Sequence, residues 1–437
     1  MDEQHVLHAL KELDPEVYQK LQQELQLQRL SLSLEATTNP ESPLVTYLES
    51  SVLANNSVAY PALKQCGPFE TLVLQRTKEV FGADHAIVRL HGTASAARVV
   101  LEGLLQPGAA VLSFNGHMQE GCQDLHYRFA SFCLDAATRT LAADVYEEKI
   151  KEIQPQLVIL SPRDYPLPMD YEKLVAIAHK QGALVWISLG QNAGFIAAGL
   201  MPSPVPYADV VTFPTHDSLH GPEGAIILCK EKLAPALEQT VLEHGYTSLQ
   251  KNHLAALALI LKEATSEAAK AYFTQVRGNA KALGQALAIQ GLPLFYGPDS
   301  TENTHLAIVQ LPKSFTPQQA EAKLKTAGLL VKADSLWLEG QAEPVSALRL
   351  STLNPTSRSL KEYHMNLIAA DIARALQATD EAELLDIREQ VGVLVMEKPI
   401  FSEEWLPKVE EDEGEEALPF DGGRQKKRRF LQNLFHH

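Results

Sequence analysis

The sequence predicts an α/β fold in which helices cover both faces of a mostly parallel sheet, followed by a smaller α+β unit. Three observations lead to this prediction. From residue 86 to residue 229, short apolar runs alternate with amphipathic stretches of helical period. After residue 290 the predicted strands and helices form a second set. A chain of 437 residues, 45% of them hydrophobic, can bury a full core and is expected to divide into one large and one smaller domain.

The chain is expected to begin with a polar helix over residues 14–29. Asp14 is a suitable N-cap, and Pro15 occupies the first helical position. The apolar stripe of this helix is thin and consists of Val17, Leu21 and Leu25. Such a stripe usually packs on a partner subunit or on a domain surface.

The large domain follows a turn-rich region at 35–68 that contains a helix at 44–53, and a further helix is predicted at 69–81. Parallel strands are predicted at 86–90, 110–114, 157–161, 183–188 and 209–213, an antiparallel return at 225–229, and helices at 95–105, 146–152 and 171–181. Ligands of such sheets bind outside the carboxyl ends of the strands. The rim of one crevice is therefore expected at Gly92–Ser95, Ser161–Tyr165, Ser188–Asn192 and Pro214–Ser218.

The second half begins with a helix-rich stretch at 248–290. The smaller unit is predicted to contain strands at 306–311, 328–331 and 347–351 and helices at 317–327 and 360–375. The expected domains are an N-terminal helical arm (1–35), a large domain (36–290), a small α+β domain (291–400) and a flexible tail, acidic and then basic (401–437).

Charge and cysteine content exclude several classes of function. The net charge of −16 and the pI near 5.4 argue against general binding of nucleic acid or anionic membranes. No run approaches the roughly 18 apolar residues of a membrane span, and the N-terminus lacks a basic region followed by an apolar core, so we expect a cytoplasmic protein. The four cysteines show no CxxC spacing and are interpreted as reduced thiols without a metal site.

Six short motifs occur together in the order and spacing of one known family. They are Asp14-Pro15-Glu16, Phe81-Gly82-Ala83-Asp84, Leu104-Leu105-Gln106-Pro107-Gly108, Gly194-Phe195-Ile196-Ala197-Ala198-Gly199, Pro204-Val205-Pro206-Tyr207-Ala208-Asp209 and Gly221-Pro222-Glu223-Gly224. On these motifs the chain resembles the serine hydroxymethyltransferases from about residue 14 to about residue 400. The resemblance implies a type I pyridoxal-phosphate fold that works as a homodimer with its active site at the subunit interface.

The same resemblance places Asp217 at the position of the family's cofactor lysine, and this chain has no lysine between Lys180 and Lys230. In the family a lysine amine holds pyridoxal phosphate as a Schiff base. An aspartate cannot form that bond, and its charge is repelled by a phosphate dianion. The acidic partner of the pyridine nitrogen falls at Ser188, and the histidine that meets the substrate falls at Gln191.

Other positions that the resemblance assigns to the cofactor also differ. The phosphate loop reads His-Gly-Thr-Ala, in which Thr93 and backbone amides at a helix N-terminus could bind an anion weakly. The tyrosine and the glutamate of another family motif fall at Asn56 and Val58, and the arginine after Gly-Pro falls at Glu223.

Three residues keep the family's residue types. Arg349 matches the arginine that grips the substrate carboxylate, and His117 matches the histidine stacked on the cofactor ring. Arg349 could equally pair with a carboxylate at a domain junction, and His117 could be an ordinary loop histidine. His216 is retained beside Asp217 and is interpreted either as a hydrogen-bonded structural residue or as half of an acid–base pair. Vestiges of a cofactor site are thus predicted at Thr93, His117, Ser188 and His216.

The tail is the other candidate for function. A basic cluster follows an acidic run and precedes an apolar helical face suited to a groove on a partner or to a membrane surface. The predicted docking residues are Lys426, Lys427, Arg428, Arg429, Phe430 and Leu434. The alternative is a solvated end that folds back on the acidic run.

The concerted change of residues around one crevice favours a pseudoenzyme. The hypothesis is a catalytically inactive, serine hydroxymethyltransferase-like scaffold or regulatory subunit, with no cofactor expected. The alternative is an enzyme related to this family that binds pyridoxal phosphate noncovalently, or another small carboxylate ligand, in the old crevice.

Overall fold

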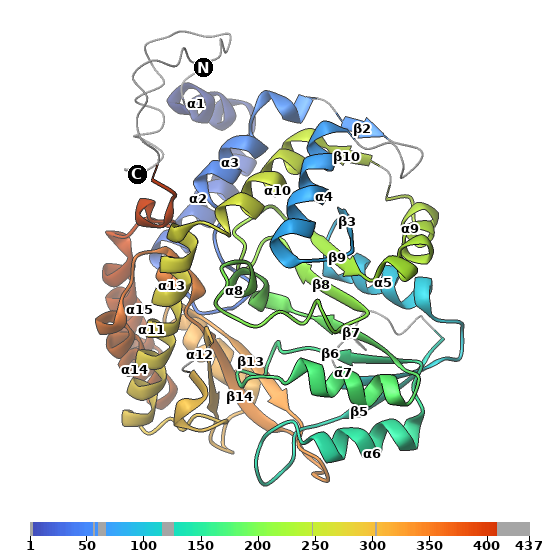
Figure 1. Ribbon diagram of the computed structural model, residues 1–437. Helices are drawn as coiled ribbons and strands as arrows, with labels where there is room; N and C mark the ends of the chain where they lie inside the picture. The colour runs from blue at the N-terminus through green and yellow to red at the C-terminus, as the bar shows by residue number, and fades with distance from the viewer. Residues whose placement is uncertain are drawn as a thin grey trace.

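The protein is described by a computed structural model over residues 3–55, 57–59, 67–115, 126–246, 248–301 and 304–408. Its centre is a seven-stranded sheet in the order β3-β9-β8-β7-β6-β4-β5 (Figure 1). The strands are β3 (His85–Leu90), β4 (Ala110–Phe114), β5 (Arg128–Phe132), β6 (Leu157–Leu160), β7 (Leu184–Ser188), β8 (Val210–Pro214) and β9 (Ala225–Cys229). Neighbours from β8 to β5 pair in parallel, while β9 runs antiparallel to β3 and β8. The predicted mostly parallel sheet with an antiparallel return is confirmed.

Alternation of side chains along these strands explains why helices cover both faces. Successive residues of a strand point to opposite faces, so Trp186 lies in one apolar cluster while Val185 and Ile187 lie in another. The cluster around Trp186 is covered by α5 (Thr93–Leu104) and α9 (Ala234–Glu243). The opposite face is covered by α4 (Pro68–Phe81), α6 (Ala143–Ile153), α7 (Tyr171–Lys180) and α10 (Lys251–Glu263).

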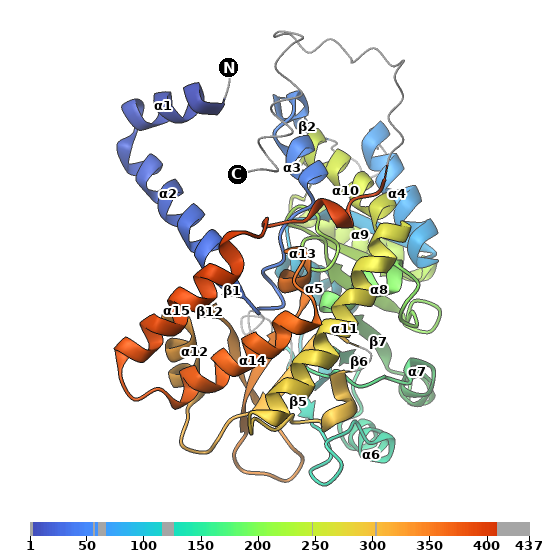
Figure 2. The ribbon, with the colours of Figure 1, turned by 90° about the vertical axis from the view of Figure 1, so that its left-hand side faces the viewer.

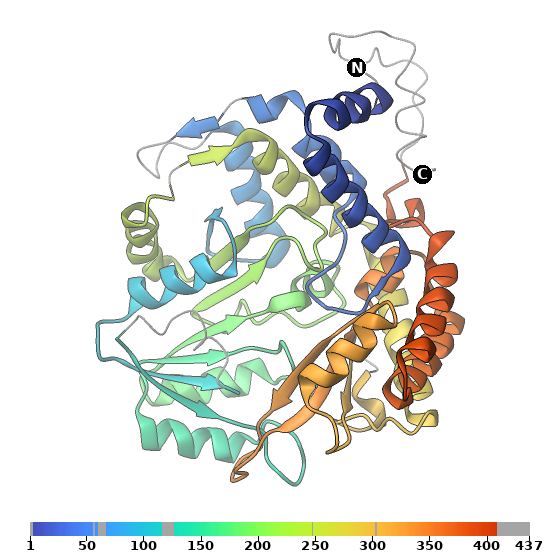
Figure 3. The ribbon, with the colours of Figure 1, turned by 180° about the vertical axis from the view of Figure 1, so that it is seen from behind.

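The smaller unit contains a three-stranded antiparallel sheet, β11-β14-β13, packed with helices (Figure 3). Its elements are β11 (Leu306–Gln310), β13 (Lys332–Leu336), β14 (Val345–Ser351), α12 (Pro317–Thr326), α13 (Leu353–Ser357), α14 (Glu362–Gln377) and α15 (Glu381–Met396), and α11 (Glu267–Ile289) links it to the large unit. The strand predicted at 328–331 shortens to β12 (Leu329–Leu330). It pairs in parallel with β1 (Leu32–Ser33) and lies outside this three-stranded sheet.

The N-terminal arm consists of α1 (Glu3–Leu13) and α2 (Pro15–Leu30) and projects from the body (Figure 2). Asp14 caps α2 as predicted, because its Oδ1 accepts a hydrogen bond from the Val17 amide at 3.0 Å. No residue of α2 is buried, and Val17 is 51% exposed. The predicted apolar stripe is therefore open in the single chain. The remaining short elements are α3 (Pro43–Glu49), α8 (Ala193–Ala197), β2 (Ser57–Ala59) and β10 (Ser248–Gln250). No described helix is long and apolar enough to cross a membrane.

Replacing Arg358 with alanine is expected to loosen the end of the arm. The buried guanidinium donates to the carbonyls of Gln28 and Ser31 at the C-terminus of α2. Burial lowers the pKa of Arg358 to about 10. Hydrogen bonds from a charged donor contribute about 1.5–3 kcal/mol each, so limited proteolysis should cleave α2 several-fold faster in the variant. Replacing the exposed Arg29 with alanine is the matched control, and equal cleavage rates would contradict the anchoring role.

Candidate functional site

The loop after β8 is closed by its own hydrogen bonds. The Thr215 amide donates to the Gly224 carbonyl at 3.1 Å, the Gly221 amide to the Thr215 carbonyl at 3.0 Å, and the Thr215 hydroxyl to the Pro222 carbonyl at 2.6 Å. A Cβ at Gly221 would lie 2.6 Å from the Thr215 oxygen and 2.4 Å from a methyl of Ile260, so only glycine fits there. This closed loop presents Asp217 at the carboxyl end of the sheet.

Asp217 is buried, with 2% of its surface exposed, and its contacts come from the chain itself. Its Oδ2 accepts a hydrogen bond from Gln191 Nε2 at 2.9 Å, and its Oδ1 lies 3.1 Å from His216 Nε2. Its backbone carbonyl accepts from Asn39 Nδ2 at 3.0 Å. The structure thus brings together three predicted site residues, and two of them, Asp217 and Gln191, are hydrogen-bonded to each other.

His216 lies between two carboxylates. Its Nε2 faces Asp217, and its Nδ1 lies 3.3 Å from Glu223 Oε2. Burial lowers the pKa of this imidazole, but the hydrogen bond and charge of Asp217 and the charges of Glu223 and Glu41 together raise it above its ordinary value. This arrangement favours the imidazolium form, which stabilises the buried carboxylate of Asp217.

The N-terminus of α5 lies beside a carboxylate of the chain itself. Thr93 is exposed at the first turn, and Ser95 Oγ accepts a hydrogen bond from the Gly92 amide at 3.2 Å. A Cβ on Gly92 would lie 3.3 Å from Glu223 Oε1, so the Glu223 carboxylate lies beside this terminus. A negative group there interacts favourably with the helix dipole.

Arg349, on the middle strand of the smaller sheet, is paired with a carboxylate that the sequence did not single out. Its Nη1 lies 2.6 Å from Oδ1 of Asp164, in the loop that follows β6, and the two residues are 5% and 2% exposed. The pair joins the two units of the fold. This is the structural interpretation of Arg349 that the sequence left open.

Of the other predicted residues that the structure describes, Ser188 makes no hydrogen bond to Asp217, Gln191 or His216. Ser188 ends β7 in register with Thr212 of β8. The backbone of Val58 pairs with Leu249 across β2 and β10. The predictions for Asn56, for His117 and for the tail docking residues lie outside the described residues.

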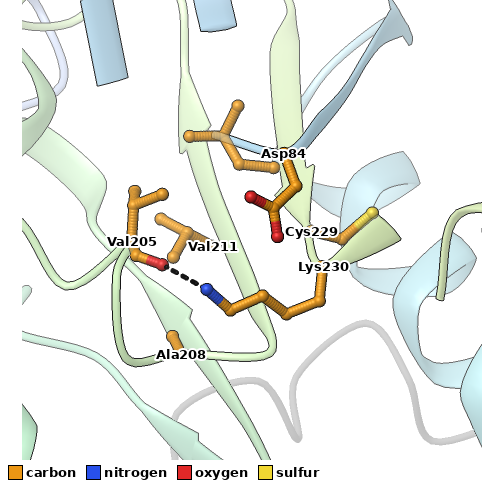
Figure 4. A pocket seen from close by; sticks show the side chains of 7 residues that line it. Asp84, Val205, Ala208, Val211, Cys229 and Lys230 are labelled. Carbon is orange, nitrogen blue, oxygen red and sulfur yellow. Dashed lines mark hydrogen bonds between the residues drawn. The ribbon is translucent and has the colours of Figure 1, made fainter. Parts of the chain in front are cut away.

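Lys230, the first lysine after the loop, lies at the opposite end of the sheet. Figure 4 shows it at a small pocket also lined by Asp84, Val205, Ala208, Val211, Leu228 and Cys229. Its ammonium donates to the carbonyls of Val205 and Pro206 at 3.2 and 3.0 Å. The pocket has a volume of about 10 Å³, which suits a single water molecule. Lys230 therefore lies at the other end of the sheet from Asp217, the position that the sequence resemblance aligns with the family's lysine. Within the described ranges, no group of three His, Cys, Asp or Glu side chains is placed to hold a metal ion.

Comparison with known proteins identifies the relatives of this fold. Residues 10–372 match the family model described as serine hydroxymethyltransferase. The chain is also 33% identical over 414 residues to a serine hydroxymethyltransferase from Myxococcus xanthus (strain DK1622), an alignment that covers 91% of this chain and 98% of that protein.

These matches correct the expectation that the chain takes no cofactor. Proteins of the matched family normally bind pyridoxal phosphate, so the comparisons point to this cofactor rather than to none. The described residues fit it in part. The backbone at the start of α5 and the exposed Thr93 could face a phosphate, but the Glu223 carboxylate lies beside them and would repel it. Asp217, which the sequence resemblance aligns with the family's lysine, carries a carboxylate and cannot form a Schiff base.

Motifs, fold and matched relatives agree over most of the length. The seven-stranded sheet, the glycine corner at Gly221 and the family match over 10–372 are features of one lineage. The chain belongs to the serine hydroxymethyltransferase family.

Proposed function

We propose that this chain has lost the lysine-dependent hydroxymethyl transfer of its family and works as a scaffold or regulatory subunit. The observation that carries the proposal is the buried Asp217, which stands at the lysine position and is hydrogen-bonded to Gln191. Two residues that replace catalytic types thus contact each other. Gln191 donates a hydrogen bond to one oxygen of the Asp217 carboxylate, and His216 lies beside the other oxygen. These contacts stabilise the carboxylate in the interior.

The same conclusion follows from the chemistry that remains. Ser188 carries no charge with which to keep a pyridine nitrogen protonated, and Arg349 is engaged by Asp164. Pyridoxal phosphate supplies an electron sink when it is bound. The residues of this chain would hold such a ring without attaching it covalently and without the carboxylate partner of its nitrogen.

Interconversion of serine and glycine by the purified chain, with added pyridoxal phosphate and a reduced folate that accepts the one-carbon group of serine, tests the proposal. We expect no turnover above the background without enzyme, measured beside the Myxococcus xanthus relative. Turnover above background, or a lysine adduct found by mass spectrometry after borohydride reduction, would contradict the proposal.

The variant Asp217→Lys is expected to stay inactive. The new amine restores only one of several altered groups, because Gln191 and Ser188 remain as they are. It also removes the acceptor of the Gln191 hydrogen bond and places a cation beside His216. The expected activity is below about 1% of the relative's, a barrier difference of more than about 2.7 kcal/mol. Asp217→Asn, which keeps the shape, is the matched control for folding. Recovery of activity in Asp217→Lys alone would show that the single substitution explains the loss.

A second candidate is a protein that holds pyridoxal phosphate noncovalently and uses His216 with Asp217 as an acid–base pair. The contact of His216 with Asp217 and the raised pKa of His216 favour it. A ligand that binds only the folded state raises the melting temperature. The melting temperatures of the wild type and of the variants Thr93→Ala and Arg349→Ala are measured with pyridoxal phosphate, glycine and serine. A shift lost in Thr93→Ala indicates a bound phosphate, and a shift lost in Arg349→Ala indicates a bound carboxylate. Shifts that survive both substitutions would place the ligand elsewhere.

We further propose that the chain forms a homodimer and that its tail recruits a partner. The apolar residues left open on the arm, such as Val6, Leu13 and Val17, support an interface with a second copy. Light scattering of the full chain and of a variant lacking residues 1–30 tests the dimer. A pull-down with and without residues 424–437 tests the tail, and unchanged partners after truncation would remove it from the proposal.

A further inference from the structure

Arg349 and Asp164 form a short, buried ion pair of the kind that a protein arginine forms with the carboxylate of a bound ligand. Arg349 lies in the centre of the smaller sheet, where β14 pairs with both β11 and β13. Asp164 reaches it from the large unit, with 2.6 Å between Nη1 and Oδ1. A short, buried contact between guanidinium and carboxylate is the mode by which proteins bind small carboxylates.

Asp164 is held in this position by its neighbours. The Tyr296 hydroxyl donates to the Asp164 backbone carbonyl at 2.7 Å. Arg163 Nε lies 3.4 Å from the same Oδ1, while Arg163 Nη2 donates to Asp334 Oδ2 at 3.0 Å. The loop therefore delivers one carboxylate to Arg349 at a fixed place.

The guanidinium of Arg349 retains donor capacity. Its Nε is buried and has no hydrogen-bond partner among the described residues. The neighbouring His305 does not compete with Asp164, because burial, and then the charge of Arg349, lowers the pKa of His305 to about 3 and keeps that imidazole neutral. The charge of Arg349 acts to lower the pKa of Glu35, while burial, the larger effect, raises it. Asp164 is the carboxylate in direct contact with Arg349.

We propose that the Asp164 carboxylate occupies the position on the Arg349 guanidinium that the carboxylate of a ligand would otherwise take. Asp164 thereby prevents amino acids and other small carboxylates from binding there. The inference rests on the proposed function, since an enzyme acting on serine would need the Arg349 guanidinium free to bind the substrate carboxylate.

Chemical rescue tests the inference. Asp164→Ala removes the carboxylate and leaves Arg349 buried without its partner, so the melting temperature is expected to fall by several degrees. Formate carries the carboxylate that this truncation removes. At constant ionic strength, replacing chloride by formate should raise the melting temperature of Asp164→Ala progressively with concentration. The wild type and Asp334→Ala, which removes the partner of Arg163, should respond only as they do to any change of salt.

The double variant Asp164→Ala/Arg349→Met should abolish the rescue, because it removes the guanidinium. Equal formate responses in Asp164→Ala and in the double variant would overturn the inference. If Asp164→Ala does not fold, Asp164→Ser also removes the carboxylate and leaves space for formate, and the same comparison with its own Arg349→Met double variant decides the matter. Turnover of serine by the wild type judges the proposed function separately, because the rescue measures stability and needs no activity.

Discussion

Replacing Glu70 with alanine is expected to lower the free energy of unfolding by about 3–5 kcal/mol. Glu70 on α4 accepts two hydrogen bonds from Arg89 on β3, from Nε at 2.7 Å and from Nη2 at 3.0 Å, and both side chains are buried. Removing the carboxylate leaves a buried guanidinium without its counter-charge, which is the costly way to break such a pair. Urea denaturation followed by circular dichroism measures the change.

The matched comparison is the double variant Glu70→Leu/Arg89→Met. It removes both charges and fills their space with apolar atoms, so its loss should be clearly smaller than that of Glu70→Ala. A single variant that loses less than about 1 kcal/mol would mean that water reaches the guanidinium. The outcome matters for the site as well, because β3 leads directly into the Gly92 turn and the terminus of α5.

The strands that could be predicted from the sequence are those that are buried on both faces of the sheet. Strands buried on both faces, such as β6 and β8, are continuous apolar runs and were predicted within one residue. β5 and β13 were missed, since Arg-Phe-Ala-Ser-Phe and Lys-Ala-Asp-Ser-Leu are only partly buried and show no such run. Their strand conformation comes from pairing with a neighbour, which a local pattern does not encode.

The candidate site shows the same division. Sequence motifs located Asp217, Gln191 and His216 on one rim, and the structure brings these residues together. Nothing in the sequence pointed to Asp164 within the predicted rim or to Asn39, whose amide donates to the Asp217 carbonyl. Both act through contacts more than 170 positions away along the chain, so only the folded arrangement reveals their partners.

Replacing Glu263 with glutamine is expected to change how stability depends on pH. Burial at the end of α10 raises the pKa of Glu263 to about 7, although a hydrogen bond from the Ser42 hydroxyl at 3.1 Å acts to lower it. A raised pKa means that the folded state binds the proton more tightly than the unfolded state. The contribution of the protonated Glu263 carboxyl to the free energy of unfolding is therefore fully present below pH 4.5, decreases as the pH rises toward 7, and is lost above pH 7. The difference corresponds to about 3 kcal/mol.

The measurement must be a difference between two proteins, because other groups act in the opposite sense. Burial lowers the pKa of His220 and of His253 to about 4, so the unfolded chain takes up their protons first and acidification destabilises the fold below pH 6.5. Glu263→Gln leaves the effects of His220 and His253 on stability unchanged, and its glutamine is uncharged at every pH. The stability of the variant relative to the wild type should thus rise between pH 4.5 and 7. Glu148→Gln, at an exposed position on α6, should show no such trend. A flat difference for Glu263→Gln would mean that the carboxylate is ionised at pH 7 without cost, and hence that water reaches the junction of α10 with the segment before α3.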